Sequence, residues 1–145
     1  MPEKATIERA RQDAREGKSA STQAGEFVRE EIRHIRQGKH GARSTKQAIA
    51  IGLSKARRAG VKLPAPKTGK PETRRKAELD LDRGKQPRRP SGKRSRAVTK
   101  ALRREGRVAA SRKSLAKHAR AAARKRSPTQ RSAAARKAAR TRAHK

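Results

Sequence analysis

The side chains that could carry out chemistry in this sequence are mostly basic. Of 145 residues, 44 are Lys or Arg and 12 are Asp or Glu, and the formal net charge is +32. The absence of Cys excludes disulfides, thiolate metal sites and Cys nucleophiles. The segment Gly17-Lys18-Ser19 matches the end of a phosphate-binding loop, but Gln12 stands where that motif requires a glycine.

The four histidines, at positions 34, 40, 118 and 144, lack metal-ligand spacing, and we expect them to be solvated. We therefore predict no enzyme, no cofactor, no metal site and no small-molecule substrate.

The basic residues predict a polyanionic partner, because each Lys or Arg that meets a phosphate releases condensed counterions. Their excess is uneven: residues 1–63 carry a net +8, residues 64–94 a net +7, and residues 95–145 a net +17 with Glu105 as the only acid. We expect the phosphate contacts to come from the loop and ends of an N-terminal helical hairpin and from the C-terminal tail. The candidates are Lys39, Arg43, Lys46, Lys55, Arg57, Arg58, Lys100, Arg103, Arg104, Arg112, Lys113, Lys117, Arg120, Arg124, Lys125, Arg126, Arg136, Lys137 and Arg140.

Helical spacing and helix-capping residues predict a helical module over residues 1–63, with helices over 7–16, 23–37 and 45–59. Thr6 can cap the first helix, and Ser44 with Gln47 has the spacing of a capping box before the third. The second and third helices carry apolar stripes, which include Phe27 in the second, and predict an αα-hairpin. Glu26–Arg29 and Glu30–Arg33 are expected as ion pairs on the exposed side of the second helix.

The rest of the chain is poor in residues that build a core. Leu, Ile, Val and Phe number 16 in the whole sequence, whereas Ala numbers 27. Residues 64–94 hold five of the seven prolines and are predicted to be a linker, in which a short helix over 73–81 is possible. The tail, residues 95–145, is predicted to form helices over 96–105, 108–126 and 128–142, capped at Ser95 and, with Gln130 completing a box, at Ser127. The expected fold class is all-α, with a tail that is disordered or conditionally helical.

Three stretches resemble an uncharacterised family of small, highly basic bacterial proteins, whose members are sometimes labelled DNA-binding or plasmid-stabilisation proteins. They are residues 26–36 (EFVREEIRHIR), 39–61 (KHGARSTKQAIAIGLSKARRAGV) and 93–106 (KRSRAVTKALRREG). The Ala/Lys/Arg-rich tail is also similar in composition to linker-histone tails and to bacterial histone-like proteins. The resemblance implies DNA binding or plasmid stabilisation and assigns no residue a role.

These observations favour largely sequence-independent binding of double-stranded DNA by phosphate neutralisation. Residues 38–43 form a second candidate site, because backbone N–H groups at the start of the helix after them attract phosphate. Phe27 is the single aromatic residue, which disfavours proteins that stack single-stranded bases. An RNA- or ribosome-associated protein remains the main alternative; a membrane-surface binder and a toxin–antitoxin component are weaker ones.

The start of the sequence lacks the apolar segment of a secretory signal, and no run is long enough to insert stably into a membrane. We therefore expect a bacterial cytoplasmic protein located at the nucleoid. The sequence leaves the oligomeric state open.

Overall fold

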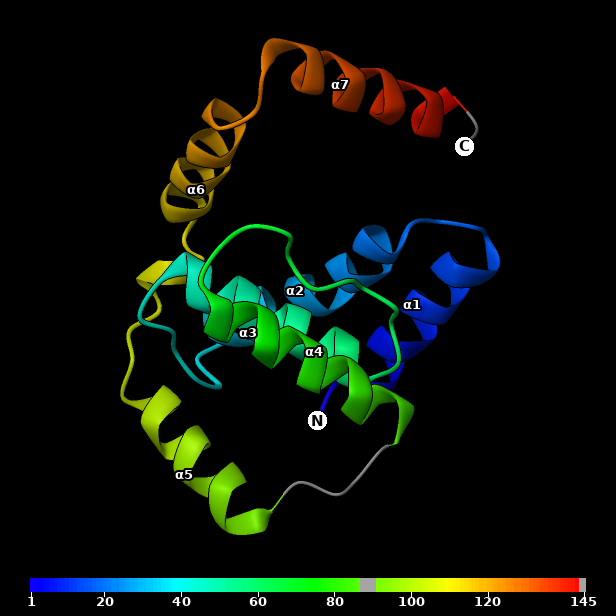
Figure 1. The fold of residues 1–145 in the computed structure, drawn as a ribbon. Helices are drawn as coiled ribbons and strands as arrows, with labels where there is room; N and C mark the ends of the chain where they lie inside the picture. The colour runs from blue at the N-terminus through cyan, green and yellow to red at the C-terminus, as the bar shows by residue number, and fades with distance from the viewer. Residues whose placement is uncertain (87–90, 144–145) are drawn as a thin grey trace. The chain divides into compact units, whose positions relative to one another are not determined.

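The structure is a computed structural model that describes residues 1–86 and 91–143. All regular secondary structure in these two ranges is helical and none is a strand, which confirms the all-α fold class (Figure 1). The chain divides into two compact units: unit 1 is Met1–Ser111 and unit 2 is Arg112–Lys145. Within the two described ranges, none of the helices is both long and apolar enough to cross a membrane.

Unit 1 begins with three helices that pack in sequence: α1 (Lys4–Arg15), α2 (Ala20–Arg36) and α3 (Thr45–Arg58). The predicted hairpin is present, since α2 packs on both α1 and α3. The core is small and rich in alanine because the sequence offers few larger apolar side chains. Phe27 is its largest member, 1% exposed, and is surrounded by buried Ala10, Ala24, Ala56 and Val61.

The predicted start of α3 is confirmed, whereas α2 begins three residues before the predicted 23, at Ala20, and the predicted start of α1 is wrong. Ser19 accepts a hydrogen bond from the backbone N–H of Thr22, and Ser44 accepts one from that of Gln47. The first helix begins earlier, at Lys4, and Thr6 is buried inside it rather than capping it. Thr6 is available for burial because it lies on the face of α1 that turns toward the core.

The expected linker contains a helix that packs on the module. Helix α4 (Pro71–Lys85) lies against α3 (Figure 1). The contact is close at Gly84, where a Cβ atom would lie 2.2 Å from the backbone oxygen of Arg57. Asp80 is 3% exposed and accepts a hydrogen bond of 2.5 Å from the hydroxyl of Ser54. The sequence pattern missed this packing because α4 is held by a small residue and a buried carboxylate rather than by leucines. Residues 87–90 of the expected linker lie outside the described residues.

Helix α5 (Gly92–Arg103) and a 3-10 turn, η1 (Val108–Ala110), complete unit 1. Ser91 caps α5, and Ser95 lies inside the helix, so the predicted cap at Ser95 is wrong. The single helix predicted over 108–126 is two elements, because Ser111 is extended, with a ψ of 152°. Ala109 and Ala110 are buried, and unit 1 therefore ends within the stretch that the sequence analysis assigned to the tail.

Unit 2 contains α6 (Arg112–Arg124) and α7 (Pro128–Ala143). The capping box at the start of α7 is confirmed in both directions: the N–H of Gln130 bonds to the hydroxyl of Ser127, and the N–H of Ser127 bonds to the side-chain oxygen of Gln130, each at 3.2 Å. The expected alternative of a disordered tail does not hold for residues 112–124 and 128–143, which are helical. Alanine, the strongest helix former, supports this outcome without any buried contact.

Candidate nucleic-acid interface

Unit 2 carries the least compensated charge of the protein. Residues 112–145 contain 13 Lys or Arg and no acid. Every Lys and Arg in α6 and α7 is exposed. Because α6 advances about 100° per residue, its cations at positions 113, 117, 120 and 124 fall within about 60° of one another. The opposite side holds Ser114, Leu115 and His118, which are partly buried. Helix α6 is therefore cationic on one side.

Helix α7 distributes its charge differently. By the same geometry, Arg131, Arg136, Lys137, Arg140 and Arg142 point to nearly all sides of the helix. No residue of α7 is buried. A helix that is cationic all round can contact phosphates on more than one side.

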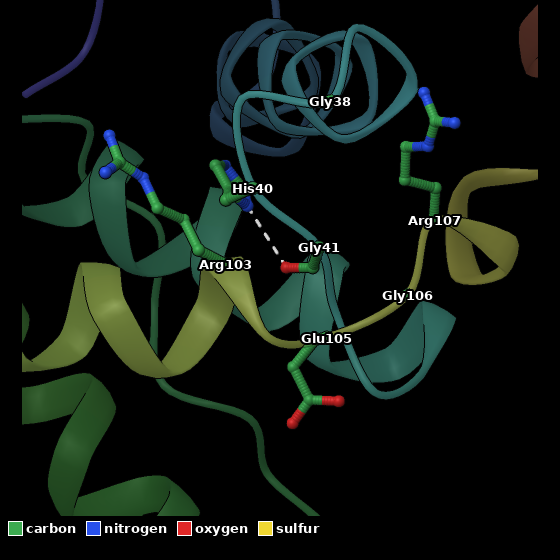
Figure 2. Close-up of a pocket in the computed structure, with 7 residues that line it drawn as sticks. All are labelled: Gly38, His40, Gly41, Arg103, Glu105, Gly106 and Arg107. Atoms are coloured by element: carbon green, nitrogen blue, oxygen red, sulfur yellow. Dashed lines mark hydrogen bonds between the residues drawn. The ribbon is translucent and has the colours of Figure 1, made fainter.

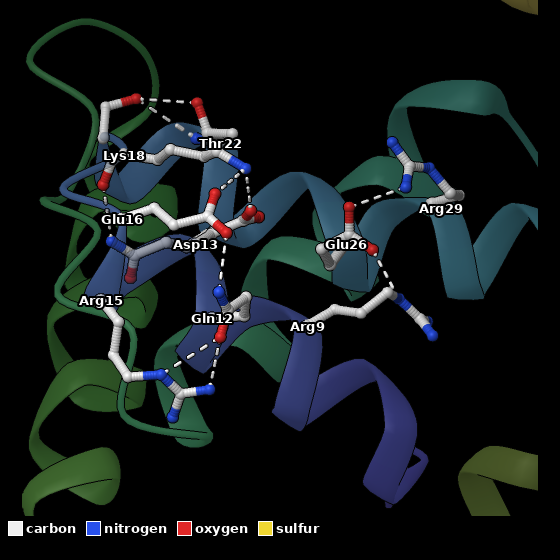
Figure 3. Close-up of polar contacts among 11 residues, drawn as sticks. Arg9, Gln12, Asp13, Arg15, Glu16, Lys18, Thr22, Glu26 and Arg29 are labelled. Carbon is white, nitrogen blue, oxygen red and sulfur yellow. Dashed lines mark hydrogen bonds and ion pairs between the residues drawn. The ribbon is translucent and has the colours of Figure 1, made fainter. Parts of the chain in front are cut away.

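In unit 1 most of the acidic side chains form ion pairs with nearby cations, as Figure 3 shows for α1 and the first half of α2. Lys18 lies 2.7 Å from carboxylate oxygens of both Asp13 and Glu16. Both contacts raise the pKa of the Lys18 ammonium, and the hydrogen bond to Asp13 has the larger effect. Glu26 pairs with Arg29, as predicted, and also with Arg9 of α1. Unit 1 still keeps a net charge of +19, because its 31 Lys and Arg outnumber its 12 acids.

Two of the expected phosphate-binding residues are engaged inside unit 1, which corrects the prediction for them. Lys55 lies 2.6 Å from a carboxylate oxygen of Glu31 on α2, within the α2–α3 contact. Arg57 is 8% exposed and donates hydrogen bonds to the backbone oxygens of Leu63 and Pro64. Its burial lowers the pKa of its guanidinium. Lys55 is paired with a buried carboxylate and Arg57 is itself buried and bonded to two backbone oxygens, so neither is free to meet a phosphate.

The other expected residues lie at the surface of unit 1 or in unit 2. Arg58 is exposed but contacts Asp80 at 3.5 Å, and Lys39 contacts Glu3 at 3.4 Å. The remaining candidates are exposed where the structure describes them: Arg43, Lys46, Lys100, Arg103, Arg104, Arg112, Lys113, Lys117, Arg120, Arg124, Lys125, Arg126, Arg136, Lys137 and Arg140.

The loop between α2 and α3 is covered by the end of α5 and the segment that follows it. The N–H groups of Gly41 and Ala42 donate to the backbone oxygens of Leu102 and Gly106, at 2.8 and 3.1 Å. A Cβ atom at position 41 would lie 1.9 Å from the backbone oxygen of Glu105, so only glycine fits there. These two N–H groups are therefore already bonded, whereas the attraction of phosphate by the N–H groups at the start of α3 stays a prediction.

The same contact creates a small basic hollow of about 340 Å³ beside the loop. It is lined by Gly38, His40, Gly41, Arg103, Glu105, Gly106 and Arg107. Figure 2 shows Arg103 and Arg107 on either side of the loop and the Glu105 carboxylate pointing away from it. Arg107 was missed by the sequence analysis, because it follows the predicted helix end at 105 and nothing local marks it as part of a site.

The structure also corrects the predicted surroundings of one acidic residue on α2 and of two histidines. The predicted pair Glu30–Arg33 does not form, because Glu30 is 2% exposed and Arg33 contacts Glu3 instead. His34 is 9% exposed, and its ring centroid lies 6.2 Å from that of His40, so the expectation of two solvated histidines is wrong. The chain reversal after α2 brings these rings together, and no spacing rule would have found them. His144 lies outside the described residues.

Residues 14–67 match the model of a family of unknown function, DUF6496. The matched stretch covers α2, α3 and the loop between them, and it agrees with the resemblance to an uncharacterised family. Neither the comparison with curated proteins nor that with solved structures gives a match.

Proposed function

We propose that this protein binds double-stranded DNA, largely without regard to base sequence, through phosphate contacts made mainly by unit 2. One observation carries the proposal. Unit 2 consists of two exposed helices and has 13 basic residues and no acid, whereas unit 1 pairs acids with nearby cations. The positive charge per residue is highest in unit 2, which carries +13 over 34 residues against +19 over the 111 residues of unit 1, and a polyanion is the partner that such a charge attracts.

The spacing of charge suits partial neutralisation of a duplex. The cationic row of α6 from position 113 to 124 is about 17 Å long, at 1.5 Å per residue. Duplex DNA carries about ten charges over that length, against four in the row. One copy therefore leaves most of the local DNA charge in place, and compaction requires many copies or the bridging of two duplexes by α7. This is the behaviour of a nucleoid-associated, histone-like protein in a bacterial cytoplasm.

The side chains present favour duplex over single strands and backbone contact over base reading. Phe27 is the single aromatic residue and is buried in the core of unit 1, so it offers no platform for stacking bases. The cationic row of α6 contains only Lys and Arg. Without Asn or Gln on that row, the side chains that best recognise adenine are missing from it.

The test compares the full chain with residues 1–111, binding each to duplex DNA, single-stranded DNA and a structured RNA across a salt titration. The cut belongs after Ser111, because a fragment that ended at residue 94 would also lose the segment that covers the α2–α3 loop. We expect the full chain to prefer duplex DNA of any sequence with a steep salt dependence, and residues 1–111 to lose most of the affinity and of the slope. Equal binding by the two chains would refute the assignment to unit 2.

The same experiment decides the alternative partner. Arginine stacks on bases as well as contacting phosphates, and RNA is therefore the main competing polyanion. A clear preference for structured RNA at matched salt would replace the nucleoid proposal with an RNA- or ribosome-associated role.

A further inference from the structure

Three side chains of unit 1 converge beneath the covered loop in a way that the proposed function does not use. Glu31 and His34 are one helical turn apart on α2, and His40 returns to them from the loop. One ligand atom of each lies within 4.8 Å of the others. Glu31 is fully buried and His34 nearly so, while His40 is partly buried and also lines the hollow beside the loop.

The hydrogen bond of His40 leaves one of its ring nitrogens facing a carboxylate. Its Nδ1 lies 3.1 Å from the backbone oxygen of Gly41 (Figure 2). A carbonyl oxygen only accepts, so Nδ1 must carry the hydrogen, and in the neutral ring Nε2 then holds a lone pair. That Nε2 lies 3.3 Å from Oε1 of Glu31. Oε1 is buried and accepts no hydrogen bond from any described residue. Two lone pairs at this distance repel each other unless a cation lies between or beside them.

The position of the hydrogen on the His34 ring can be assigned in the same way. The Nε2 of His34 lies 2.7 Å from Oε1 of Glu3. Arg33 and Lys39 contact the same carboxylate, so Glu3 is an acceptor and the hydrogen sits on Nε2 of His34. Nδ1 is left with a lone pair, 3.9 Å from Oε1 of Glu30, a second buried oxygen that accepts no hydrogen bond from the described residues.

We propose that Glu31, His34 and His40 bind one divalent transition-metal ion, of which Zn²⁺ fits best. Two imidazole nitrogens and one carboxylate oxygen, with a fourth position left for water, are a donor set typical of zinc. Each histidine already has its outer nitrogen fixed by a hydrogen bond, to Glu3 for one and to the Gly41 carbonyl for the other, as ligating histidines do in known metal sites. The ion enters from the hollow that His40 lines.

The neighbouring charges set how tightly this site holds the ion. Oε1 of Glu30 lies 3.9 Å from Nδ1 of His34 and adds negative charge there, part of which the Lys55 ammonium offsets at 3.7 Å. The ammonium of Lys55 binds Oε2 of Glu31 at 2.6 Å and opposes a second cation. It leaves Oε1 free, so Glu31 binds the metal through one oxygen. The bound ion would join α2 to the loop and hold the segment that covers it.

The experiment uses the full-length chain, freed of metal with a chelator and then titrated with ZnCl₂ by calorimetry, and with CoCl₂ as a probe whose visible absorption reports tetrahedral coordination. We expect one equivalent of Zn²⁺ to bind, and His40→Gln and Glu31→Gln each to weaken it at least about 100-fold. His118→Gln is the matched control, because it removes a histidine of unit 2 and should leave the affinity unchanged. Lys55→Met should strengthen binding, since it removes the competing ammonium.

Circular dichroism on each variant separates loss of binding from loss of folding. Metal that raises the melting temperature of the wild type and of His118→Gln, but not of a folded His40→Gln, supports the site. The absence of a bound equivalent of Zn²⁺ or Co²⁺ in the wild type would overturn the proposal and leave a proton on His40 as the cation beside Glu31. Equal weakening by His118→Gln and His40→Gln would also overturn it.

Discussion

Removing the cationic row of α6 tests the proposed interface most directly. The change is the quadruple variant Lys113→Gln, Lys117→Gln, Arg120→Gln and Arg124→Gln, which keeps good helix formers at all four exposed positions. If each cation meets one phosphate, the slope of log K against log salt falls by about 0.9 per contact, so by about 3.6 in total. Extrapolated from 1 M salt to about 0.15 M, this corresponds to an affinity loss of roughly 10³-fold.

The assay is fluorescence anisotropy on a labelled duplex between about 50 and 200 mM salt, the range in which such slopes are well defined. The matched control removes the same charge from exposed positions of α1 and α4, through Lys4→Gln, Arg11→Gln, Arg74→Gln and Arg75→Gln. We expect the control to change the slope far less than the α6 variant. An equal change in both would refute a defined interface and indicate that binding follows net charge alone.

The remaining predictions concern the fold that supports the interface. Gly41→Ala should lower the free energy of unfolding by about 1–3 kcal/mol, because the added Cβ meets the backbone of Glu105. Gly25→Ala should raise it by about 0.5–1 kcal/mol, because Gly25 lies inside α2 with open space around it. Urea unfolding of both variants measures these opposite effects. Asp80→Ala should cost about 1–3 kcal/mol, because it removes the buried acceptor that joins α4 to α3, and an unchanged urea midpoint would contradict this role. The pKa of Glu3 is lowered from 4.5 to about 2 in the folded chain, so its contribution to stability is present above about pH 4.5 and is lost as the pH falls toward 2. The melting temperature of the wild type should therefore exceed that of Glu3→Gln at pH 6, and the difference should vanish near pH 2.

Local sequence determined the helices and the distribution of charge. The starts at Ser19, Ser44 and Ser127 follow from side-chain oxygens that accept nearby backbone N–H groups, and such contacts need no tertiary partner. The excess of cations after residue 111 and the absence of acid there are properties of composition, as is the exclusion of thiol chemistry. The family match over residues 14–67 likewise depends on sequence alone.

Tertiary structure decided which charged groups are available and where unit 1 ends. The sequence predicts Lys55 and Arg57 as surface cations, but in the folded chain Lys55 pairs with the buried Glu31, and Arg57 is buried and bonds to the backbone of residues 63–64. The segment 102–110 belongs to unit 1 because Gly41 permits close backbone contact, a long-range condition that leaves no periodic signal. His34 and His40 meet Glu31 only when the chain reverses after α2. A sequence fixes which groups exist, whereas burial and pairing depend on which surfaces the folded chain brings together.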